Sequence, residues 1–328
     1  MSYLEKQKRG NKYYYYLAHT IRLKNNKYKK VRLYLNSYEK ELAQNEENNL
    51  VLDNIERFDT YLDEQFPELS TDFHIDIFFK DVDTLFLQSD LLQVEIVKKR
   101  YQKIKSNLDY YRTLRDSFLI SHSYNSTKVE GNTLTKDDTI LILSKGILSK
   151  TKELREANEI LNISKAIDFI EEYDRELTVD FICQVHKVVT QNTLIESRNE
   201  GVLRPIGINV RMGNSDYKNV PGGNMIKKSL NDSIKEFNKL YKIDKLGAIV
   251  RFYASFIAIH PFIDGNGRTS RILLNWLMKK ENLPYINYES EKHIEHIRGI
   301  DKAIKGNGFD DLAEFILTIV VENEFTRK

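Results

Sequence analysis

His260-Pro261-Phe262-Ile263-Asp264-Gly265-Asn266-Gly267-Arg268-Thr269-Ser270-Arg271 joins two apolar segments with helical spacing, Leu246–Ile259 and Arg268–Leu277. Pro261 ends the first helix, because the residue before a proline is pushed out of the helical region. Glycine is sparse in the chain, with 14 residues, yet two of them lie in this connection. The sequence therefore predicts a tight, glycine-rich loop that leads directly into the N-terminus of a helix.

This predicted loop combines groups that bind phosphate. Gly265 and Gly267 allow backbone N–H groups to turn inward, and the helix dipole adds positive potential at the same point. Arg268 and Arg271 are three residues apart, so they share a face of the second helix. We interpret the two arginines, together with Gly265, Asn266 and Gly267, as a polyphosphate-binding site.

Two further residues of the loop indicate catalysis. Asp264 places a carboxylate among anion-binding groups, as expected of a ligand for Mg²⁺ that bridges phosphate oxygens. His260 is placed to take a proton from an incoming hydroxyl. Each residue alone has an ordinary structural explanation, such as a helix cap or a turn. Their combination within one short segment indicates a nucleotide-dependent transferase.

The segment His260–Arg271 resembles the signature of the Fic family of nucleotidyl-transferring enzymes, His-Pro-Phe-x-Asp/Glu-Gly-Asn-Gly-Arg-x-x-Arg, without a departure. The similarity covers roughly residues 110–325. It implies a mainly α Fic-fold helical bundle that transfers AMP from ATP to a Ser, Thr or Tyr hydroxyl of a protein, with Mg²⁺ as cofactor. By this resemblance His260 is the base and Asp264 the Mg²⁺ ligand. The residues expected to contact the phosphates are Gly265, Asn266, Gly267, Arg268 and Arg271.

A hairpin is predicted at Ile206–Val220, where glycines and Asn214 are typical of turns. By the same resemblance, Ile208–Tyr217 occupies the place of the family's flap, which registers the backbone of the target protein by strand addition. The residues expected to dock the target are Ile208, Asn209, Val210, Arg211 and Tyr217.

The segment Ser126–Asn132 resembles the inhibitory motif Ser/Thr-x-x-x-Glu-Gly/Asn of one class of Fic proteins, with Ser126 and Glu130 at its two named positions. A carboxylate paired with Arg271 would remove the partner of the γ-phosphate and turn the α-phosphate away from in-line attack. The same glutamate could instead orient a water toward an AMP–protein linkage. The sequence leaves both alternatives open: a transferase autoinhibited by Glu130, or a bifunctional enzyme whose main direction is removal of AMP.

The composition is that of a globular protein, with 41% hydrophobic and 30% charged residues among 328, which excludes disordered and fibrous classes. The net charge of +2 conceals an asymmetry. Residues 1–36 hold ten Lys and Arg against one acidic residue, whereas the remaining 292 residues hold 40 Lys and Arg against 47 Asp and Glu. The chain is a basic arm on an acidic body, a pattern typical of a binding appendage.

The basic arm is predicted to form a small N-terminal β-hairpin appendage. Tyr13–Leu23 and Tyr28–Leu35 are rich in aromatic and β-branched residues, and the residues between them are turn-like. A two-stranded ribbon alone is marginal in water, so it must pack on another surface. It supports a non-enzymatic alternative, a nucleic-acid-binding protein whose residues 1–36 place cations on phosphates and tyrosines on bases.

The remaining chain is predicted to be helical. We divide it into a basic appendage at 1–37, a helical N-terminal region at 38–120, and a Fic catalytic domain at 121–328 that includes the inhibitory helix. Helices are predicted at Glu39–Gln65, Asp83–Leu119, Thr135–Leu148, Glu153–Tyr173, Val179–Gln191, Met225–Tyr241, Lys245–His260, Arg268–Lys280, Ile294–Lys305 and Asp310–Glu324.

Cys183 is the only cysteine, so neither an intrachain disulfide nor a cysteine-based zinc site can form, which fits a reducing cytoplasm. No apolar run approaches the length of a membrane span, and no membrane partner is expected. His186, on an apolar helix face, is interpreted as a packed or capping histidine. The sequence does not name the target protein, and it leaves open modification of the chain itself and assembly into a homo-oligomer.

Overall fold

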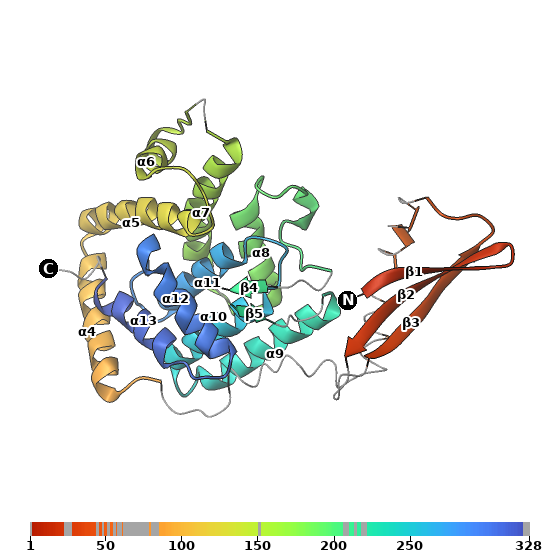
Figure 1. Ribbon diagram of the computed structural model, residues 1–328. Helices are drawn as coiled ribbons and strands as arrows, with labels where there is room; N and C mark the ends of the chain where they lie inside the picture. The colour runs from red at the N-terminus through yellow and green to blue at the C-terminus, as the bar shows by residue number, and fades with distance from the viewer. Residues whose placement is uncertain are drawn as a thin grey trace. The chain divides into compact units, whose positions relative to one another are not determined.

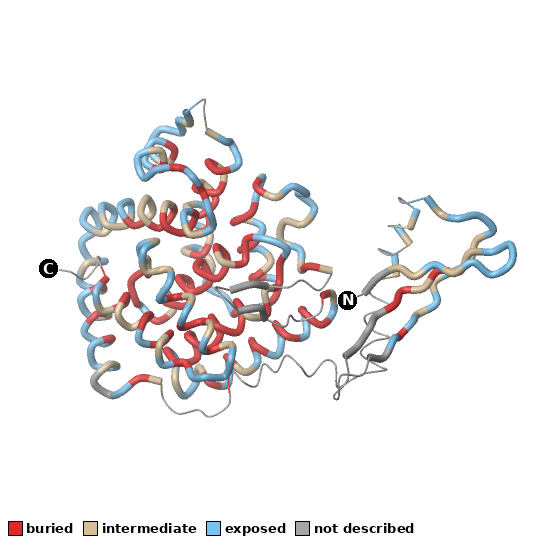
Figure 2. The backbone as a smooth tube through the Cα atoms, in the orientation of Figure 1, coloured by how far each residue is buried: buried red, intermediate tan, exposed pale blue. Residues whose placement is uncertain are grey.

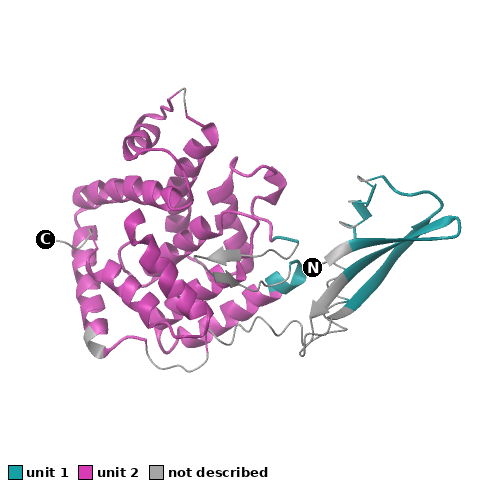
Figure 3. Cartoon of the chain, in the orientation of Figure 1, with its two compact units in different colours: residues 1–73, 204–208, 220–227 teal, residues 74–203, 209–219, 228–328 magenta. Residues whose placement is uncertain are grey.

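The computed structural model describes residues 2–22, 28–43, 46–47, 49–50, 53–54, 57, 61, 79, 85–149, 152–205, 210–212, 215–217 and 222–323 (Figure 1). The chain divides into two compact units (Figure 3). The first comprises residues 1–73, 204–208 and 220–227, and the second comprises residues 74–203, 209–219 and 228–328. Each unit is described by itself.

The first unit contains a three-stranded antiparallel sheet in the order β1-β2-β3. The strands are β1 (Ser2–Arg9), β2 (Lys12–Arg22) and β3 (Tyr28–Tyr38). The predicted hairpin is present as β2 and β3, and β1 adds a third strand, with Leu4 opposite Leu17. Tyr15 is fully buried, and its hydroxyl accepts a hydrogen bond from the backbone N–H of Leu42 at 2.9 Å. The segment after β3 therefore covers one face of the sheet.

The second unit is helical. Its helices are α4 (Gln88–Lys105), α5 (Leu108–Lys128), α6 (Lys136–Lys145), α7 (Leu154–Glu172), α8 (Val179–Thr190), α10 (Lys245–Ile259), α11 (Asn266–Lys280), α12 (His293–Ile304) and α13 (Asp310–Val321). Helix α9 (Asn224–Leu240) leads into α10. Short 3-10 helices lie at Ser197–Asn199 and Ser290–Lys292. The fold is thus mainly α, as predicted, and every helix predicted after residue 130 is present.

The core of the helical unit is built around α10 and α11. Nearly every residue of α10 is buried, as expected of a helix that is apolar on all sides and surrounded by other helices. Helix α11 contacts α10 as well as α7 and α8. The buried residues concentrate on these central helices (Figure 2). The loop between α10 and α11 is therefore flanked by two buried helices.

Two helix predictions were wrong in detail. The single helix predicted at Asp83–Leu119 is two helices, because the side chain of Asn107 accepts a hydrogen bond from the backbone N–H of Tyr110 and starts α5. The helix predicted at Glu39–Gln65 does not begin at Glu39, since residues 39–43 are not helical, and much of the remaining range lies outside the described residues. The predicted boundary at residue 120 falls inside α5.

Candidate active site

The segment His260–Gly265 forms the predicted loop between α10 and α11. Helix α10 ends at Ile259, and His260 takes a left-handed conformation with φ of 49°, which turns the chain out of the helix. Helix α11 then starts at Asn266. The Asn266 side chain accepts a hydrogen bond from the Phe262 N–H at 2.9 Å and donates one to the Phe262 carbonyl at 2.8 Å. These bonds close the loop on itself, so the Asn266 amide fixes its shape.

His186, on α8, supports the loop from the other side. Its Nδ1 accepts a hydrogen bond from the Gly201 N–H at 2.9 Å, so its Nε2 donates to the Asp264 carbonyl, also at 2.9 Å. The imidazole stacks on the Phe262 ring at 3.7 Å. Burial, and less strongly the charge of Arg268, lower the pKa of His186 to about 4. His186 is therefore a neutral packing residue, as interpreted from the sequence, and it also holds the loop.

Gly265 in the loop and Gly267 in the first turn of α11 are both required by close approaches. Gly265 has a φ of 75°, and a Cβ there would lie 2.6 Å from Cγ2 of Thr190. Gly267 has helical geometry, but a Cβ there would lie 2.2 Å from Oε1 of Glu130. The Glu130 carboxylate therefore lies directly over the first turn of α11, where unpaired N–H groups and the helix dipole favour an anion.

The structure brings Glu130, Ser126 and Arg271 together although they are distant in the sequence. Nε of Arg271 donates to Oγ of Ser126 at 2.9 Å, and Nη2 donates to the Ser126 carbonyl at 2.7 Å and to Oε1 of Glu130 at 2.8 Å. The Arg271 side chain is 6% exposed, and that of Glu130 is 36% exposed. A buried guanidinium thus has one charged partner and one edge bound to the end of α5.

The electrostatics of this pair favour its charged form. Burial alone would raise the pKa of the Glu130 carboxyl, but the charge and hydrogen bond of Arg271 and the charge of Arg268 hold it below its ordinary value. Burial would also lower the pKa of Arg271, but the charge of Glu130 outweighs it and raises that pKa. Both groups are therefore ionised at neutral pH.

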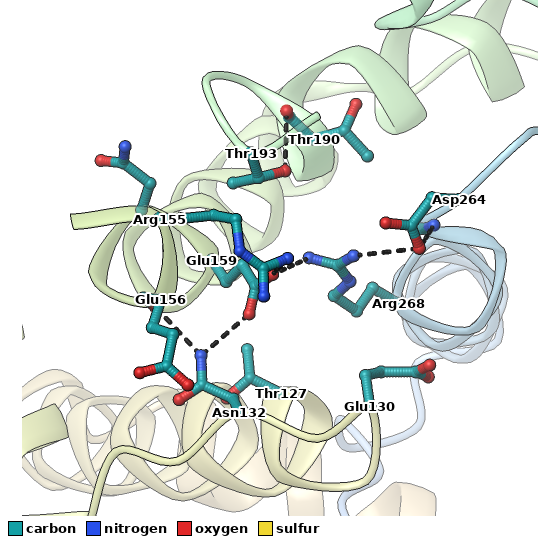
Figure 4. Close-up of polar contacts among 12 residues, drawn as sticks. Thr127, Glu130, Asn132, Arg155, Glu156, Glu159, Thr190, Thr193, Asp264 and Arg268 are labelled. Atoms are coloured by element: carbon teal, nitrogen blue, oxygen red, sulfur yellow. Dashed lines mark hydrogen bonds and ion pairs between the residues drawn. The ribbon is translucent and has the colours of Figure 1, made fainter. Parts of the chain in front are cut away.

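Arg268 is held by a carboxylate that the sequence analysis missed. Its guanidinium lies between two carboxylates, with Nη1 at 3.2 Å from Oε1 of Glu159 and Nη2 at 3.4 Å from Oδ1 of Asp264 (Figure 4). Glu159 belongs to α7 and is almost fully buried. No sequence signal singles it out, because it is one of several glutamates on an amphipathic helix.

Asp264 fits the predicted role of a Mg²⁺ ligand. Its side chain is 55% exposed, and its Oδ1 accepts a hydrogen bond from the Gly265 N–H. Within the described part of the chain, no group of three or more His, Cys, Asp or Glu side chains could hold a metal ion. Mg²⁺ in nucleotide sites is commonly held by one or two carboxylates and by substrate phosphates, so a single exposed carboxylate suits it.

The predicted hairpin is present as β4 (Val210–Met212) and β5 (Ser215–Tyr217), with Val210 opposite Tyr217. Ile208 and Asn209 lie outside the described residues. Of Val210, Arg211 and Tyr217 the backbone alone is described.

Comparison with known proteins shows a match to one protein family over part of this site. Residues 176–278 match the Fic/DOC family, and they include both the loop and the two arginines. The chain contains a Fic domain. Glu130 and Ser126 lie before the matched residues of this Fic domain.

Relatives and solved structures extend the likeness beyond the Fic domain. Protein adenylyltransferase fic-1 of Caenorhabditis elegans is 25% identical over 242 residues, which cover 71% of this chain and 45% of the relative. Protein adenylyltransferase Fic of Nematostella vectensis is 25% identical over 211 residues, which cover 61% of this chain and 47% of the relative. The chain thus spans less than half the length of these curated relatives.

Two solved structures share the fold over most of this chain. The structure of Fic-1 from Caenorhabditis elegans matches with a TM-score of 0.62 and 22% identity, over 72% of this chain and 69% of the other. A Fic-domain signaling protein from Bacteroides thetaiotaomicron matches with a TM-score of 0.61 and 19% identity, over 70% of this chain and 93% of the other. Among the described residues, no helix has the length and apolar character needed to cross a membrane.

Proposed function

We propose that this protein transfers AMP from ATP to a Ser, Thr or Tyr hydroxyl of a protein and releases pyrophosphate. The Fic domain and the curated relatives named protein adenylyltransferases support this proposal. The main structural support is the loop His260–Gly265, which leads into the N-terminus of α11 beside the buried side chains of Arg268 and Arg271. The single cysteine suits a cytoplasmic site of action.

The proposed reaction uses His260 as its base. The histidine takes the proton of the target hydroxyl while the hydroxyl oxygen attacks the α-phosphorus of ATP. The bond from that phosphorus to the oxygen that bridges it to the β-phosphate breaks, and pyrophosphate leaves with the bonding electrons. Asp264 would hold Mg²⁺, which supplies positive charge to the triphosphate when it is bound.

The proposed triphosphate site is the N-terminus of α11. The N–H groups of the first helical turn have no intrahelical partner, so they are available to phosphate oxygens. Because the Asn266 side chain is committed to Phe262, Asn266 contributes its backbone N–H and not its amide. The guanidinium groups of Arg268 and Arg271 neutralise the β- and γ-phosphates. The N–H donors are those of Asn266 and Gly267, joined by that of Gly265 once it exchanges its bond to Oδ1 of Asp264 for a phosphate oxygen.

The proposed activity is restrained by Glu130. The Glu130 carboxylate holds Arg271 at 2.8 Å and covers Gly267, so it places negative charge where the γ-phosphate would bind. Ser126 fixes the other side of the same guanidinium. ATP must displace the carboxylate to reach Arg271, and therefore the unmodified protein is expected to be a weak transferase.

The test uses ATP labelled on its phosphates. With Mg²⁺ present, label on the α-phosphate is expected to enter protein, whereas label on the γ-phosphate is not, and mass spectrometry is expected to find an AMP adduct. His260→Ala is expected to abolish incorporation while the protein keeps the melting temperature of the wild type. Incorporation that persists in His260→Ala would exclude His260 as the base. Incorporation that favours CTP or UTP would exclude ATP as the donor.

A hydrolytic direction is the alternative for the same site. About a third of the Glu130 side chain is exposed, so a water molecule can contact its carboxylate. In that case Glu130→Gly is expected to release AMP from AMP-modified target, supplied without ATP, more slowly than the wild type does. Equal release by the two proteins would exclude a role for Glu130 in positioning water.

The hairpin β4–β5 is the proposed docking element for the target protein. Its strands are short and antiparallel, so an extended target segment could add to an edge and place its hydroxyl in register. Arg211 and Asp216 form the pair that is not hydrogen-bonded across the hairpin, so the Arg211 N–H faces the open edge of β4. Replacing Arg211 by Pro removes this outward donor and is expected to raise the KM for the target protein without changing the affinity for ATP. An unchanged KM would exclude strand addition at that position.

A second candidate function, nucleic-acid binding, rests on the N-terminal sheet. Tyr34 lies 6.4 Å from Tyr14 and 5.6 Å from Tyr16, ring centre to ring centre, and it is 44% exposed. The Arg9 guanidinium stands 5.7 Å from the Tyr14 ring. Exposed aromatic rings beside cations on a basic arm are the features that bind single-stranded nucleic acid.

The test of this second function has a matched control. Tyr34→Ala in the full chain is expected to weaken the binding of a labelled single-stranded oligonucleotide, and the wild-type affinity is expected to fall as salt rises. Tyr110→Ala removes a tyrosine of similar exposure, 46%, from α5 and is expected to have no effect. Equal affinity of the two variants would exclude the tyrosine surface as the binding site.

A further inference from the structure

Glu159 is a buried carboxylate that the proposed mechanism does not use. Its Oε1 lies 3.2 Å from Nη1 of Arg268 and 3.2 Å from Nη1 of Arg155, and its Oε2 accepts a hydrogen bond from Nδ2 of Asn132 at 2.9 Å. Figure 4 shows the carboxylate at the centre of these three side chains. A buried carboxylate is costly unless it is paired, so this arrangement holds its partners in place.

The orientation of Arg268 depends on Glu159 more than on Asp264. The side chains of Arg268 and Glu159 are 4% and 6% exposed, whereas that of Asp264 is 55% exposed and screened by solvent. Nε and Nη1 of Arg268 are buried, and neither makes a hydrogen bond to any residue that the structure describes, so Glu159 holds Nη1 by an ion pair at 3.2 Å and not by a hydrogen bond. Glu159 therefore holds one corner of the guanidinium and leaves the Nε edge to an acceptor that is not part of the described chain.

Asn132 connects this pair to the inhibitory segment. The turn that follows α5 contains Glu130, which binds Arg271, and leads to Asn132, which binds Glu159 and, at 3.1 Å, the carbonyl of Glu156. The two arginines of α11 are thus attached to the short segment from Glu130 to Asn132. A movement of Glu130 would reach Arg268 through Asn132 and Glu159.

We propose that Glu159 is a positioning residue, which orients Arg268 for the triphosphate and joins that orientation to the turn carrying Glu130. This inference rests on the proposed function. The negative charge of Glu159 is essential to it, because without that charge Asp264 is the carboxylate that remains in an ion pair with Arg268 among the described residues. The guanidinium would then leave the phosphate position and engage the carboxylate proposed to bind Mg²⁺.

Glu156 provides a matched control on the same helix. It is 5% exposed and accepts hydrogen bonds from the Thr133 N–H at 2.6 Å and from the Thr133 hydroxyl at 2.9 Å. It therefore fastens the same turn as Glu159 does, but through Thr133 and not through Arg268. A purely structural effect on the turn should appear in Glu156→Gln as strongly as in Glu159→Gln.

The experiment compares these variants in a Glu130→Gly protein, where the inhibitory carboxylate is absent. The dissociation constant of Mg·ATP is measured by calorimetry, and kcat and KM are measured for AMP incorporation. Glu159→Gln is expected to weaken ATP binding and raise KM about tenfold, equivalent to about 1.4 kcal/mol, with a smaller change in kcat. Glu156→Gln is expected to stay within about twofold of the parent, below about 0.4 kcal/mol.

Arg268→Ala completes the test. In that background Glu159→Gln is expected to have no further effect on ATP binding, because the group through which it acts is gone. The proposal is overturned if Glu159→Gln binds ATP like its parent, if Glu156→Gln loses as much affinity, or if the loss persists without Arg268. If the Glu130→Gly parent itself binds no ATP, the proposed function fails, and this inference fails with it.

Discussion

A methyl group added at Gly267 tests where the Glu130 carboxylate lies. In Gly267→Ala the new Cβ would stand 2.2 Å from Oε1 of Glu130, well inside the 3.0 Å below which real contacts of this kind essentially never fall. The backbone of α11 is fixed by its burial, so the carboxylate must withdraw. Its hydrogen bond to Nη2 of Arg271, 2.8 Å long, is then broken.

The expected magnitude follows from two opposing effects. A charge-assisted hydrogen bond contributes about 1.5–3 kcal/mol, which we reduce to about 1.5–2 kcal/mol because a third of the Glu130 side chain is exposed. Alanine in place of glycine stabilises a helix by about 0.5–1 kcal/mol. Gly267→Ala is therefore expected to lower the free energy of unfolding by about 1 kcal/mol. In a Glu130→Ala protein the same change should instead raise it by about 0.5–1 kcal/mol.

Trp276 provides the assay, because it is the only tryptophan of the chain and is 1% exposed within α11. Its fluorescence during urea unfolding reports on the helical unit alone. The four proteins of the double-mutant cycle should give a coupling energy of about 1.5–2 kcal/mol between positions 130 and 267. An identical cost of Gly267→Ala with and without Glu130 would refute the placement of the carboxylate over the helix N-terminus.

Two further predictions test the surroundings of the site. Burial lowers the pKa of His122 to about 3 from 6.5, so the unfolded chain binds a proton that the folded one excludes, and stability falls as pH drops below about 6.5. Between pH 7.5 and pH 5 the wild type is expected to lose about 2 kcal/mol of its free energy of unfolding that His122→Phe retains. An equal pH dependence of the two proteins in urea unfolding would contradict this prediction. Gly265→Ala is expected to lose activity and stability, and Thr190→Ser, which removes the Cγ2 that the new Cβ would meet at 2.6 Å, should restore part of both. If Thr190→Ser restores neither activity nor stability to Gly265→Ala, the Thr190 methyl group is not what obstructs the new Cβ.

The central loop could be predicted from the sequence because its chemistry is contiguous. His260, Asp264 and the two arginines lie within twelve residues, and Pro261 marks the end of the preceding helix. The ends of α10 and α11 follow from these residues and from the apolar segments beside them. Local rules are sufficient where the residues that form a site are neighbours in the chain.

The partners of the arginines were predictable only in part. Glu130 was singled out through its resemblance to a known motif, and in the structure its Oε1 lies 2.8 Å from Nη2 of Arg271. Glu159 was not found, because its contact with Arg268 joins residues on two different helices and its helical pattern is ordinary. Similarly, a single Asn107 side chain divides a continuous amphipathic pattern into α4 and α5. Such contacts depend on tertiary packing, which periodicity does not encode.

The incorporation of AMP from α-labelled ATP by the wild type, by Glu130→Gly and by Glu130→Gly/His260→Ala tests the account most directly. Loss of one charge-assisted hydrogen bond to Arg271 predicts that Glu130→Gly labels protein about 10- to 100-fold faster than the wild type. The double variant should give no labelling at all. Equal rates for wild type and Glu130→Gly, or labelling that survives without His260, would contradict an AMP transferase restrained by Glu130.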